Sequence, residues 1–403
     1  MTTGNGAVTG SGAAVIAAPP TGIERALSAA VAGGSGAGRG GGGGDAVVEV
    51  LARTRLYVLV ARLHADTPGW TAPLPTIRDE ATRRNCVPVL TPGMVPPWHP
   101  EWVFRAVSLG ELARTWPYDV RRLAVNHGTP YAAMVDARPR QLKAWLRADE
   151  RTGGHEHGVL LTDGGGPLHG PLAHGLALGA HLAVTNGLIW NRLGAAYEEY
   201  AGDRDRLRSP WGIQHRAAYR DRLASLMECQ LVGRVQESVL HVRRTLTARL
   251  GRTPTREEWA EAVARMFPVP DAYDRTVADR ALDHIPRYEE RLRADGALAP
   301  DGRVDTLAAF DLGRAVNVVR LALGARYTDP YEAEQDVLRI GRLARQAYPS
   351  WADFSLGYLM ARLVHRAEDD GPEAAESTYR QSLTEHRILT EDPASPYRNL
   401  PWS

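Results

Sequence analysis

The residues in this chain whose types and spacing could do chemistry are Asp311 and Arg314, a carboxylate and a guanidinium three positions apart. On a helical wheel with about 3.6 residues per turn, Asp311 falls among Leu307, Ala315 and Val318, inside the apolar arc. A lone buried charge costs several kcal/mol, so these two side chains are expected to pair. The pair is either an ion pair that fixes the register of the helix, or an active-site carboxylate oriented by an arginine.

The structural interpretation of this pair is favoured. The sequence couples no nucleophile, second carboxylate or histidine to it, and a single pair does not make a mechanism. The alternative is an enzyme or small-ligand binder with a polar pocket lined by Asp311, Arg314, Arg320 and Tyr358. An enclosed pair whose members satisfy each other would indicate an internal lock, whereas a pair that opens onto a cleft would indicate a site.

Aromatic residues accompany the pair, and core packing explains them more simply than a ligand cage. Trp351, Phe354 and Tyr358 lie on one face of a predicted helix. Trp211 follows Pro210, which indicates the start of a helix, so we expect Trp211 to anchor that start. The closing segment 395–402 is too apolar for a free tail, and it is predicted to dock on the helical domain.

Histidines are the remaining candidates for chemistry. His155 and His157 would share one face of a strand, and His174 and His181 one stripe of a helix. A zinc site needs three or four such groups to converge, and the sequence has no H-E-x-x-H motif to capture the ion. It also has no G-x-S-x-G nucleophile motif. We therefore expect no metal, no cofactor and no catalytic residue.

Composition and charge are those of an ordinary globular protein. Of the 403 residues, 44% are hydrophobic and 24% are charged, with a formal net charge of +1. Arginines supply almost all of the basic charge and are interspersed with Asp and Glu, a pattern typical of solvated helix faces. No apolar run approaches the roughly 18 residues of a membrane span. We expect neither nucleic acid nor a membrane as a partner.

The two cysteines, Cys86 and Cys229, lie far apart in the sequence and form neither a disulfide framework nor a thiolate metal site. Cys86 falls in a predicted apolar strand and Cys229 in a predicted helix, and both are poor settings for a reactive thiolate. The first twenty residues lack the basic lead and apolar core of a signal peptide. We expect a cytoplasmic protein in a reducing compartment.

The elements that must position these residues divide the chain into an α+β part and an all-α part. Residues 1–44 are glycine-rich and are predicted to be a disordered segment and linker, apart from a short helix that begins after Thr21. Residues 45–149 alternate between β-branched runs and short helices. The predicted strands are 56–61, 86–90, 103–107 and 123–125, and the predicted helices are 109–114 and 140–148.

After a connector over residues 150–171, helical periodicity replaces the strand pattern to the end of the chain. Thr255 and Glu258 have the spacing of a capping box, and Gly251 and Gly296 are plausible helix ends. The fold class is therefore an α+β domain followed by a larger all-α domain over 172–403. The predicted helices are 172–185, 214–250, 257–267, 272–295, 307–325, 331–347, 351–365 and 373–390.

Each part resembles a known family. The order LYVLVARL, VPVLTPG and ELARTWPYDVRRLAVNHGTP makes residues 51–148 similar to the N-terminal domain of the SseB (enhanced serine sensitivity) family. His127 stands where that family has proline. This resemblance implies a small α+β domain and no known chemistry.

The C-terminal half resembles the family called domain of unknown function 1266. Phe310 stands where that family has tryptophan, and its Gly-His sequence is absent around residues 228–233. The resemblance lies in four motifs in order: SPWGIQHRAAYRDRLASLM, AFDLGRAVNVVRLALGARYTDPYEAEQDV, YPSWADFSLGYLMARLV and SPYRNLPW.

Taken together, these features predict a cytoplasmic, non-catalytic protein that works by contact with another protein. The resemblances imply an accessory or regulatory role in a bacterial secretion or conflict system. The enzyme or small-ligand binder with a pocket around Asp311 and Arg314 remains the alternative.

Overall fold

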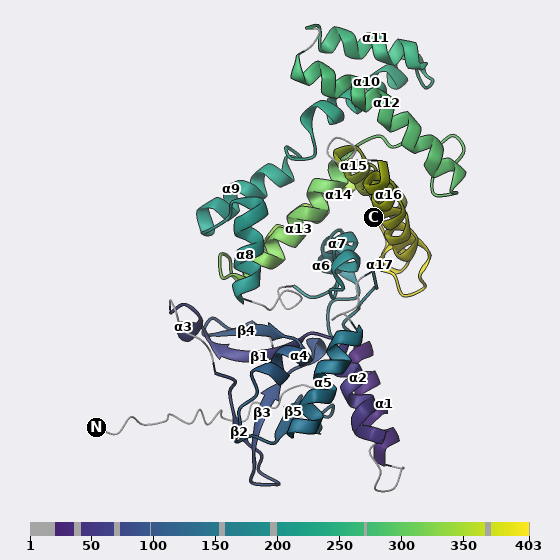
Figure 1. The fold of residues 1–403 in the computed structure, drawn as a ribbon. Coiled ribbons are helices and arrows are strands. Elements are labelled where there is room, and N and C mark those ends of the chain that lie inside the picture. Colours follow the sequence, from purple (N-terminus) through teal and green to yellow (C-terminus); the bar gives the residue numbers. More distant parts are fainter. Residues whose placement is uncertain are drawn as a thin grey trace.

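A computed structural model shows an α+β part, low in the view of Figure 1, and a helical part above it. This arrangement confirms the predicted fold class. The residues that the structure describes are 21–35, 42–67, 73–96, 98–152, 158–193, 200–269, 272–366 and 372–402.

The strands form two small sheets. In the first, β1 (Leu56–Ala61) pairs antiparallel with β4 (Trp102–Val107). The second has the order β2-β3-β5-β6, in which the β3–β5 pair is parallel and the other pairs are antiparallel. Its strands are β2 (Ile77–Arg78), β3 (Asn85–Val89), β5 (Arg122–Val125) and β6 (Ala133–Asp136).

The four predicted strands and two predicted helices are all present, with no end more than four residues from its expected place, and β2 and β6 are additional. Both additional strands are short, and they are held by their pairing with β3 and β5. The helices of this part are α1 (Gly22–Ser35), α2 (Gly42–Ala52), α3 (Arg62–Ala65), the 3₁₀ turn η1 (Pro92–Met94), α4 (Leu109–Arg114) and α5 (Pro139–Thr152).

Helix α1 belongs to the α+β core, so the linker expected over residues 1–44 is interrupted. Leu27 of α1 packs in the same core as Leu51 and Trp145. The carboxylate of Glu24 is fully buried, and it accepts hydrogen bonds from the hydroxyl of Thr91 and, at 3.1 Å, from the backbone N–H of Gly93. The disorder and the linker expected over 1–20 and 36–41 lie outside the described residues.

The helical part is built around α13 (Ala308–Gly324), which contacts α7, α8, α9, α14 and α15. Nearly every residue of α13 is buried, as expected of a helix that is apolar on most sides. The other helices are α6 (Gly170–Ala177), α7 (Ala180–Asn186), α8 (Tyr200–Trp211), α9 (Arg216–Met227), α10 (Arg234–Leu250), α11 (Arg256–Met266), α12 (Tyr273–Ala294), α14 (Pro330–Ala347), α15 (Trp351–Arg366), α16 (Pro372–Glu391) and α17 (Pro396–Asn399).

Two predicted helices are each divided in the structure. The helix expected over 172–185 breaks between α6 and α7 at Gly179, and the helix expected over 214–250 breaks between α9 and α10. At the second break Cys229 and Gly233 have φ angles of 54° and 99°. Such positive φ values cannot continue an α-helix, so the chain turns there.

The prediction that Pro210 starts a helix is wrong, because Pro210 lies inside the last turn of α8. The next residue but one, Gly212, has a φ of 67°, and its N–H donates to the carbonyl of Arg208. The N–H of Ile213 donates to the carbonyl of Leu207, which completes a glycine-based helix end. Trp211 is therefore the last residue of α8 and not an anchor at a helix start.

The closing segment docks on the helical part, as predicted. The indole N–H of Trp402 donates to the carbonyl of Tyr348 at 2.8 Å, and that of Trp351 donates to the carbonyl of Leu400 at 2.9 Å. The ring of Trp351 also stacks on Tyr397, with 4.4 Å between ring centres. Trp351 thus serves as the platform for the C-terminal segment.

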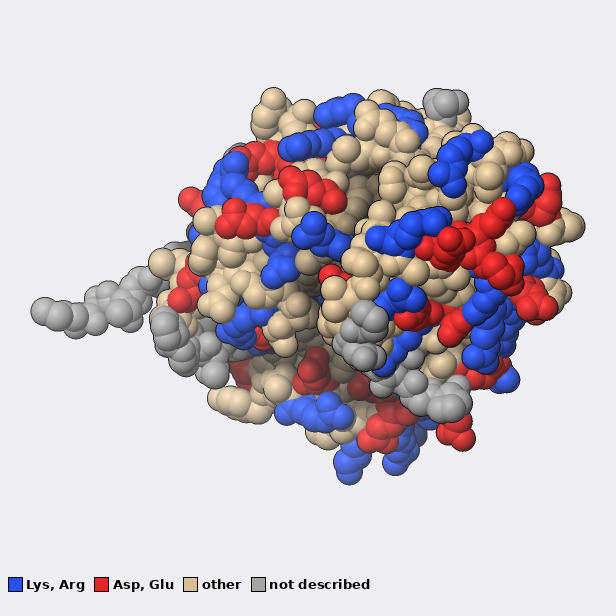
Figure 2. Space-filling model, turned by 90° about the horizontal axis from the view of Figure 1, so that it is seen from above, with Lys and Arg blue, Asp and Glu red and all other residues tan. Residues whose placement is uncertain are grey.

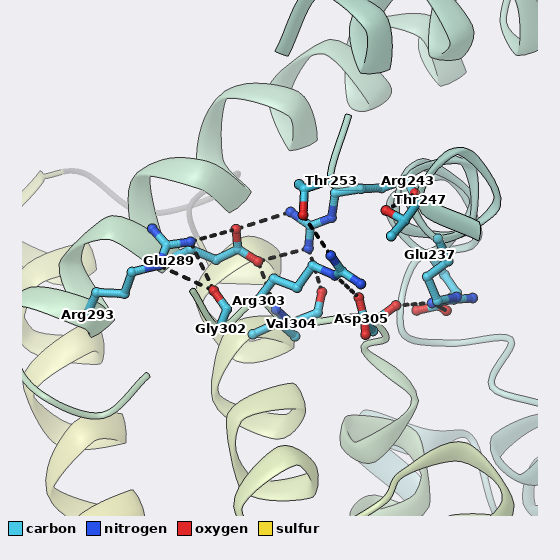
Figure 3. Close-up of polar contacts among 11 residues, drawn as sticks. Glu237, Arg243, Thr247, Thr253, Glu289, Arg293, Gly302, Arg303, Val304 and Asp305 are labelled. Carbon is cyan, nitrogen blue, oxygen red and sulfur yellow. Dashed lines mark hydrogen bonds and ion pairs between the residues drawn. The ribbon is translucent and has the colours of Figure 1, made fainter. Parts of the chain in front are cut away.

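Helices α10, α11 and α12 lie at the end of the molecule opposite the sheets and pack in a second helical core (Figure 1). A buried ion pair joins α10 to α12: Arg243 Nη2 lies 2.8 Å from Glu289 Oε1. Arg243 also donates to the carbonyl of Val304, and Glu289 accepts from the N–H of Val304 (Figure 3). The pair therefore fixes the segment that leads into α13.

Charged side chains of both signs are interspersed over the face shown in Figure 2. No single-signed surface of the kind that binds nucleic acid is visible on that face. Within the described ranges, no helix combines the length and the apolarity that crossing a membrane requires.

Candidate functional site

Asp311 is fully buried near the start of α13, and it holds the turn between α9 and α10. Its Oδ2 atom accepts hydrogen bonds from the backbone N–H groups of Leu231 at 2.7 Å and Val232 at 2.9 Å. Its Oδ1 atom lies 3.8 Å from Nη1 of Arg314, so the predicted pair exists but is loose. The carboxylate therefore lies closer to these two backbone donors than to the guanidinium of Arg314.

Burial raises the pKa of Asp311 to about 6. The two backbone hydrogen bonds and the charge of Arg314 act in the opposite direction, because each favours the ionised form. The loss of hydration outweighs these effects, so ionisation of this buried carboxyl group destabilises the folded protein. Such a cost is consistent with an internal lock between α13 and the preceding turn.

Arg314 has a different environment, because its guanidinium lies between two aromatic rings. The guanidinium carbon is 4.6 Å from the ring centre of Trp211 and 4.5 Å from that of Phe310. Cation–π contacts on two sides hold the group in place and leave its N–H edge for hydrogen bonds. Burial lowers the pKa of Arg314 from its ordinary value, and the negative charge of Asp311 opposes this.

A pocket with a volume of about 520 Å³ opens beside Arg314, between α7, α8, α13 and α15. This volume is within the range of sites for small organic molecules, roughly 300–1,000 Å³. The lining residues are Arg55, Leu182, Thr185, Asn186, Leu188, Arg206, Pro210, Trp211, Phe310, Arg314, Asn317, Leu321, Tyr358, Arg362 and His365.

The lining is cationic, because it contains four arginines and, among the described residues, no Asp or Glu. Three carboxylates lie against these arginines without lining the pocket: Glu385 is 2.9 Å from Arg362, Asp203 is 3.5 Å from Arg206, and Asp311 is 3.8 Å from Arg314. All three carboxylates are buried. The surface that a ligand would meet therefore presents guanidinium, amide and aromatic groups.

Of the residues singled out from the sequence, the structure brings Arg314, Trp211 and Tyr358 together around this pocket. Asp311 lies beside Arg314 but is not among the lining residues. The pair thus combines the two arrangements considered from the sequence: the carboxylate is enclosed, and the guanidinium opens onto a cleft.

Arg320 and Trp351 are not among the lining residues of this pocket, and both make contacts that hold the fold. Arg320 is fully buried, and its guanidinium donates to the backbone carbonyls of Trp190, at 3.3 Å, and Ile189. It ties the segment after α7 to α13. Trp351 faces the C-terminal segment through its bond to Leu400.

The structure adds Arg55, Arg206, Arg362 and His365 to the lining, although none of them was predicted from the sequence. Helical spacing carried a usable signal for two of them, because Arg362 and His365 follow Tyr358 by four and seven positions. The same spacing joins the lining residues of α13, which are Phe310, Arg314, Asn317 and Leu321.

Behind the pocket wall, two buried histidines share one serine. His181 Nε2 and His386 Nδ1 each lie 2.8 Å from the hydroxyl oxygen of Ser355. Burial lowers the pKa of His386 to about 4 and that of His181 well below its ordinary value, so both rings are neutral at pH 7. His181 also stacks on Tyr358, with ring centres 4.3 Å apart, and supports that wall of the pocket.

The two candidate metal ligands that the structure describes, His174 and His181, have separate partners. The ring centre of His174 lies 4.7 Å from that of Trp351 and 5.1 Å from that of Trp402. His181 is hydrogen-bonded to Ser355, as described above. His155 and His157 lie outside the described residues. Across the part of the chain that the structure describes, no group of three or more His, Cys, Asp or Glu residues could hold a metal ion.

The pocket combines four guanidinium groups with aromatic walls. Guanidinium groups form charge-assisted hydrogen bonds with carboxylates and phosphates, and the aromatic walls accept apolar groups. The C-terminal half now has a family match. Residues 206–402 match the family described as protein of unknown function (DUF1266).

This match confirms the resemblance found for the C-terminal half, and it includes the lining residues of α8, α13 and α15. The lining residues of α7, together with Arg55, lie outside the matched range. No curated protein and no solved structure matches the chain.

Proposed function

We propose that this protein is a non-catalytic accessory protein whose helical part binds a small organic anion in the pocket beside Arg314. The observation that carries this proposal is the position of the Arg314 guanidinium, held between Trp211 and Phe310 at the wall of the pocket. A fixed guanidinium loses little freedom on binding, so its hydrogen bonds to an anion contribute more fully to affinity.

The rest of the lining supports binding rather than turnover. The carboxylates nearest to the pocket, Asp311 and Glu385, are buried and already engaged in hydrogen bonds. Thr185 and Tyr358 supply hydroxyl groups, and that of Thr185 donates to the Glu385 carboxylate at 2.8 Å, which Arg362 also holds. These groups suit an anion that is held and released unchanged.

A calorimetric titration with two probes tests the proposal. We expect 2-naphthoate to bind and its uncharged analogue 2-naphthamide to fail. Arg314→Gln should weaken naphthoate binding about 10- to 100-fold, because a charge-assisted hydrogen bond contributes roughly 1.5–3 kcal/mol. Arg342→Gln, at an exposed position on α14, is the matched control and should leave the affinity unchanged. Equal binding of the two probes would contradict an anion site.

A protein partner, expected from the sequence, is a second candidate with its own support. Met266, Val269 and Tyr273 are 47%, 62% and 79% exposed at the turn between α11 and α12. Large apolar side chains grouped on a surface often mark a contact site. Replacing all three by serine should abolish co-purification of a specific partner from the native cell. Unchanged recovery of that partner would remove this turn from consideration.

We also propose that residues 51–148 form an SseB-like domain and that the protein is cytoplasmic and bacterial. The first proposal is supported by the strands and the α4 helix at the positions that the resemblance implies. The second is supported by Cys86 and Cys229, which are free thiols in the structure, as is usual in a reducing compartment. Cell fractionation that placed the protein outside the cytoplasm would overturn the second proposal.

A further inference from the structure

One residue of the pocket comes from the α+β part. Arg55 follows α2 and immediately precedes β1, whereas the other lining residues in the described chain come from residue 182 onward. Its position is fixed by the turn around Thr54, whose N–H donates to the carbonyl of Leu51 at 3.5 Å. Leu51 and Leu56, on either side, are fully buried in the α+β core. The α+β part therefore presents Arg55 to the pocket from a well-packed base.

Elsewhere the two parts meet through Tyr200 of α8, which is buried in the α+β core, and through polar contacts, several of them to backbone carbonyls. Arg192 donates to the carbonyl of Val95 at 2.9 Å, and Arg326 donates to that of Trp102 at 2.6 Å. The indole N–H of Trp98 donates in the other direction, to the carbonyl of Leu323 at 3.3 Å. A ligand that contacts both parts strengthens their association, because its binding free energy is lost when the parts separate.

The four arginines of the pocket come from four separate elements. Arg206 lies on α8, Arg314 on α13 and Arg362 on α15, and Arg55 lies at the junction of α2 and β1. The lining also contains apolar side chains, such as those of Trp211 and Phe310. A single carboxylate offers two acceptor oxygens, which is fewer than the four guanidinium groups in the lining. Two acidic groups on an apolar body would match the lining better.

We infer that the ligand is an organic dianion, with two acidic groups separated by a flat apolar body, and that Arg55 binds one of the groups while Arg314 and Arg362 bind the other. Occupation of the pocket then joins the α+β part to the helical part. This inference rests on the proposed function, because it requires that the pocket binds anions. It adds the class of the ligand and the contribution of the α+β part.

The test compares naphthalene-2,6-dicarboxylate with 2-naphthoate, which share the apolar body and differ in the second acidic group. The full-length protein should bind the dianion at least 10-fold more tightly than the monoanion. Arg55→Gln should remove that preference. Arg53→Gln is the matched control, because Arg53 is exposed, lies two residues earlier and is not a lining residue. It should retain the preference.

Hydrogen exchange provides a second measurement, which reports on the α+β part directly and does not depend on the affinities. The dianion should slow the exchange of amides at the start of β1 at least 5-fold in the wild type, and it should have no such effect in Arg55→Gln. Equal affinities for the two probes, or an unchanged preference in Arg55→Gln, would overturn the inference and leave the proposed function intact. Failure of both probes to bind would overturn both.

Discussion

Asp311 offers the sharpest test of the interactions that hold the helical part together. Its pKa is about 6 in the folded protein, against an ordinary value of 3.8. Each tenfold change in acidity corresponds to about 1.4 kcal/mol, so ionisation of Asp311 destabilises the folded state by roughly 3 kcal/mol at neutral pH. The folded protein binds this proton more tightly than the unfolded chain does. The favourable contribution of the protonated form is therefore present below about pH 4 and is lost as the pH rises through about 6.

Asp311→Asn keeps the shape of the side chain and an oxygen that can accept the N–H groups of Leu231 and Val232, but it cannot ionise. The stability of the wild type relative to this variant should fall by roughly 2 kcal/mol between pH 4.5 and pH 7.5. Asp311→Ala removes the acceptor and leaves two N–H groups without a partner. It should be about 2–4 kcal/mol less stable than Asp311→Asn at every pH.

Urea unfolding followed by circular dichroism measures these differences, with free energies of unfolding compared between variants at pH 4.5, 6 and 7.5. The comparison between variants cancels the titration of all other groups. A difference between the wild type and Asp311→Asn that stayed constant with pH would refute the assigned pKa. Equal stabilities of Asp311→Asn and Asp311→Ala would refute the role of this side chain as an acceptor for the turn.

Two further predictions concern the stability of the helical part. Glu289→Gln should destabilise the protein by about 3–5 kcal/mol, because it leaves Arg243 buried without its ion-pair partner, whereas the double variant Arg243→Met/Glu289→Leu should recover most of that loss in urea unfolding. An equally unstable double variant would show that the pair contributes more than its charge balance. Trp402→Ala should cost about 2–4 kcal/mol and expose the C-terminal segment to carboxypeptidase, because it removes the bond to Tyr348 and a partly buried ring. Resistance to the protease equal to that of the wild type would argue against docking.

The elements of the helical part follow from local chemistry. The period of apolar residues placed most of the helices within a few residues of their ends. The capping box is present as expected: Thr255 accepts from the N–H of Glu258 at 3.3 Å, and Glu258 accepts from that of Thr255 at 2.8 Å. Such signals act between residues three or four positions apart, so a single sequence is enough to detect them.

The errors arose where distant contacts decide the local conformation. The break before α10 depends on Asp311, 79 residues after Val232, which accepts the N–H groups of the turn. Strand β6 is defined by its pairing with β5 rather than by its composition. The prediction for Pro210 is wrong because the residues before a proline in the last turn of a helix can be the same as those before one in the first turn. Only the backbone carbonyls that accept from the N–H groups of Gly212 and Ile213 show that a helix ends here.

The sequence by itself determined that Asp311 and Arg314 lie on one buried helix and are close enough to interact, because the helical repeat sets the distance between residues three apart. It also determined the fold class, through the change from a period of two to a period of 3.6 residues. Only the tertiary structure decided that the carboxylate of Asp311 accepts from the backbone of the turn before α10 and that the guanidinium of Arg314 lines a pocket. Packing of α7, α8, α13 and α15 brings arginines together from positions more than a hundred residues apart, and no short-range pattern encodes that convergence.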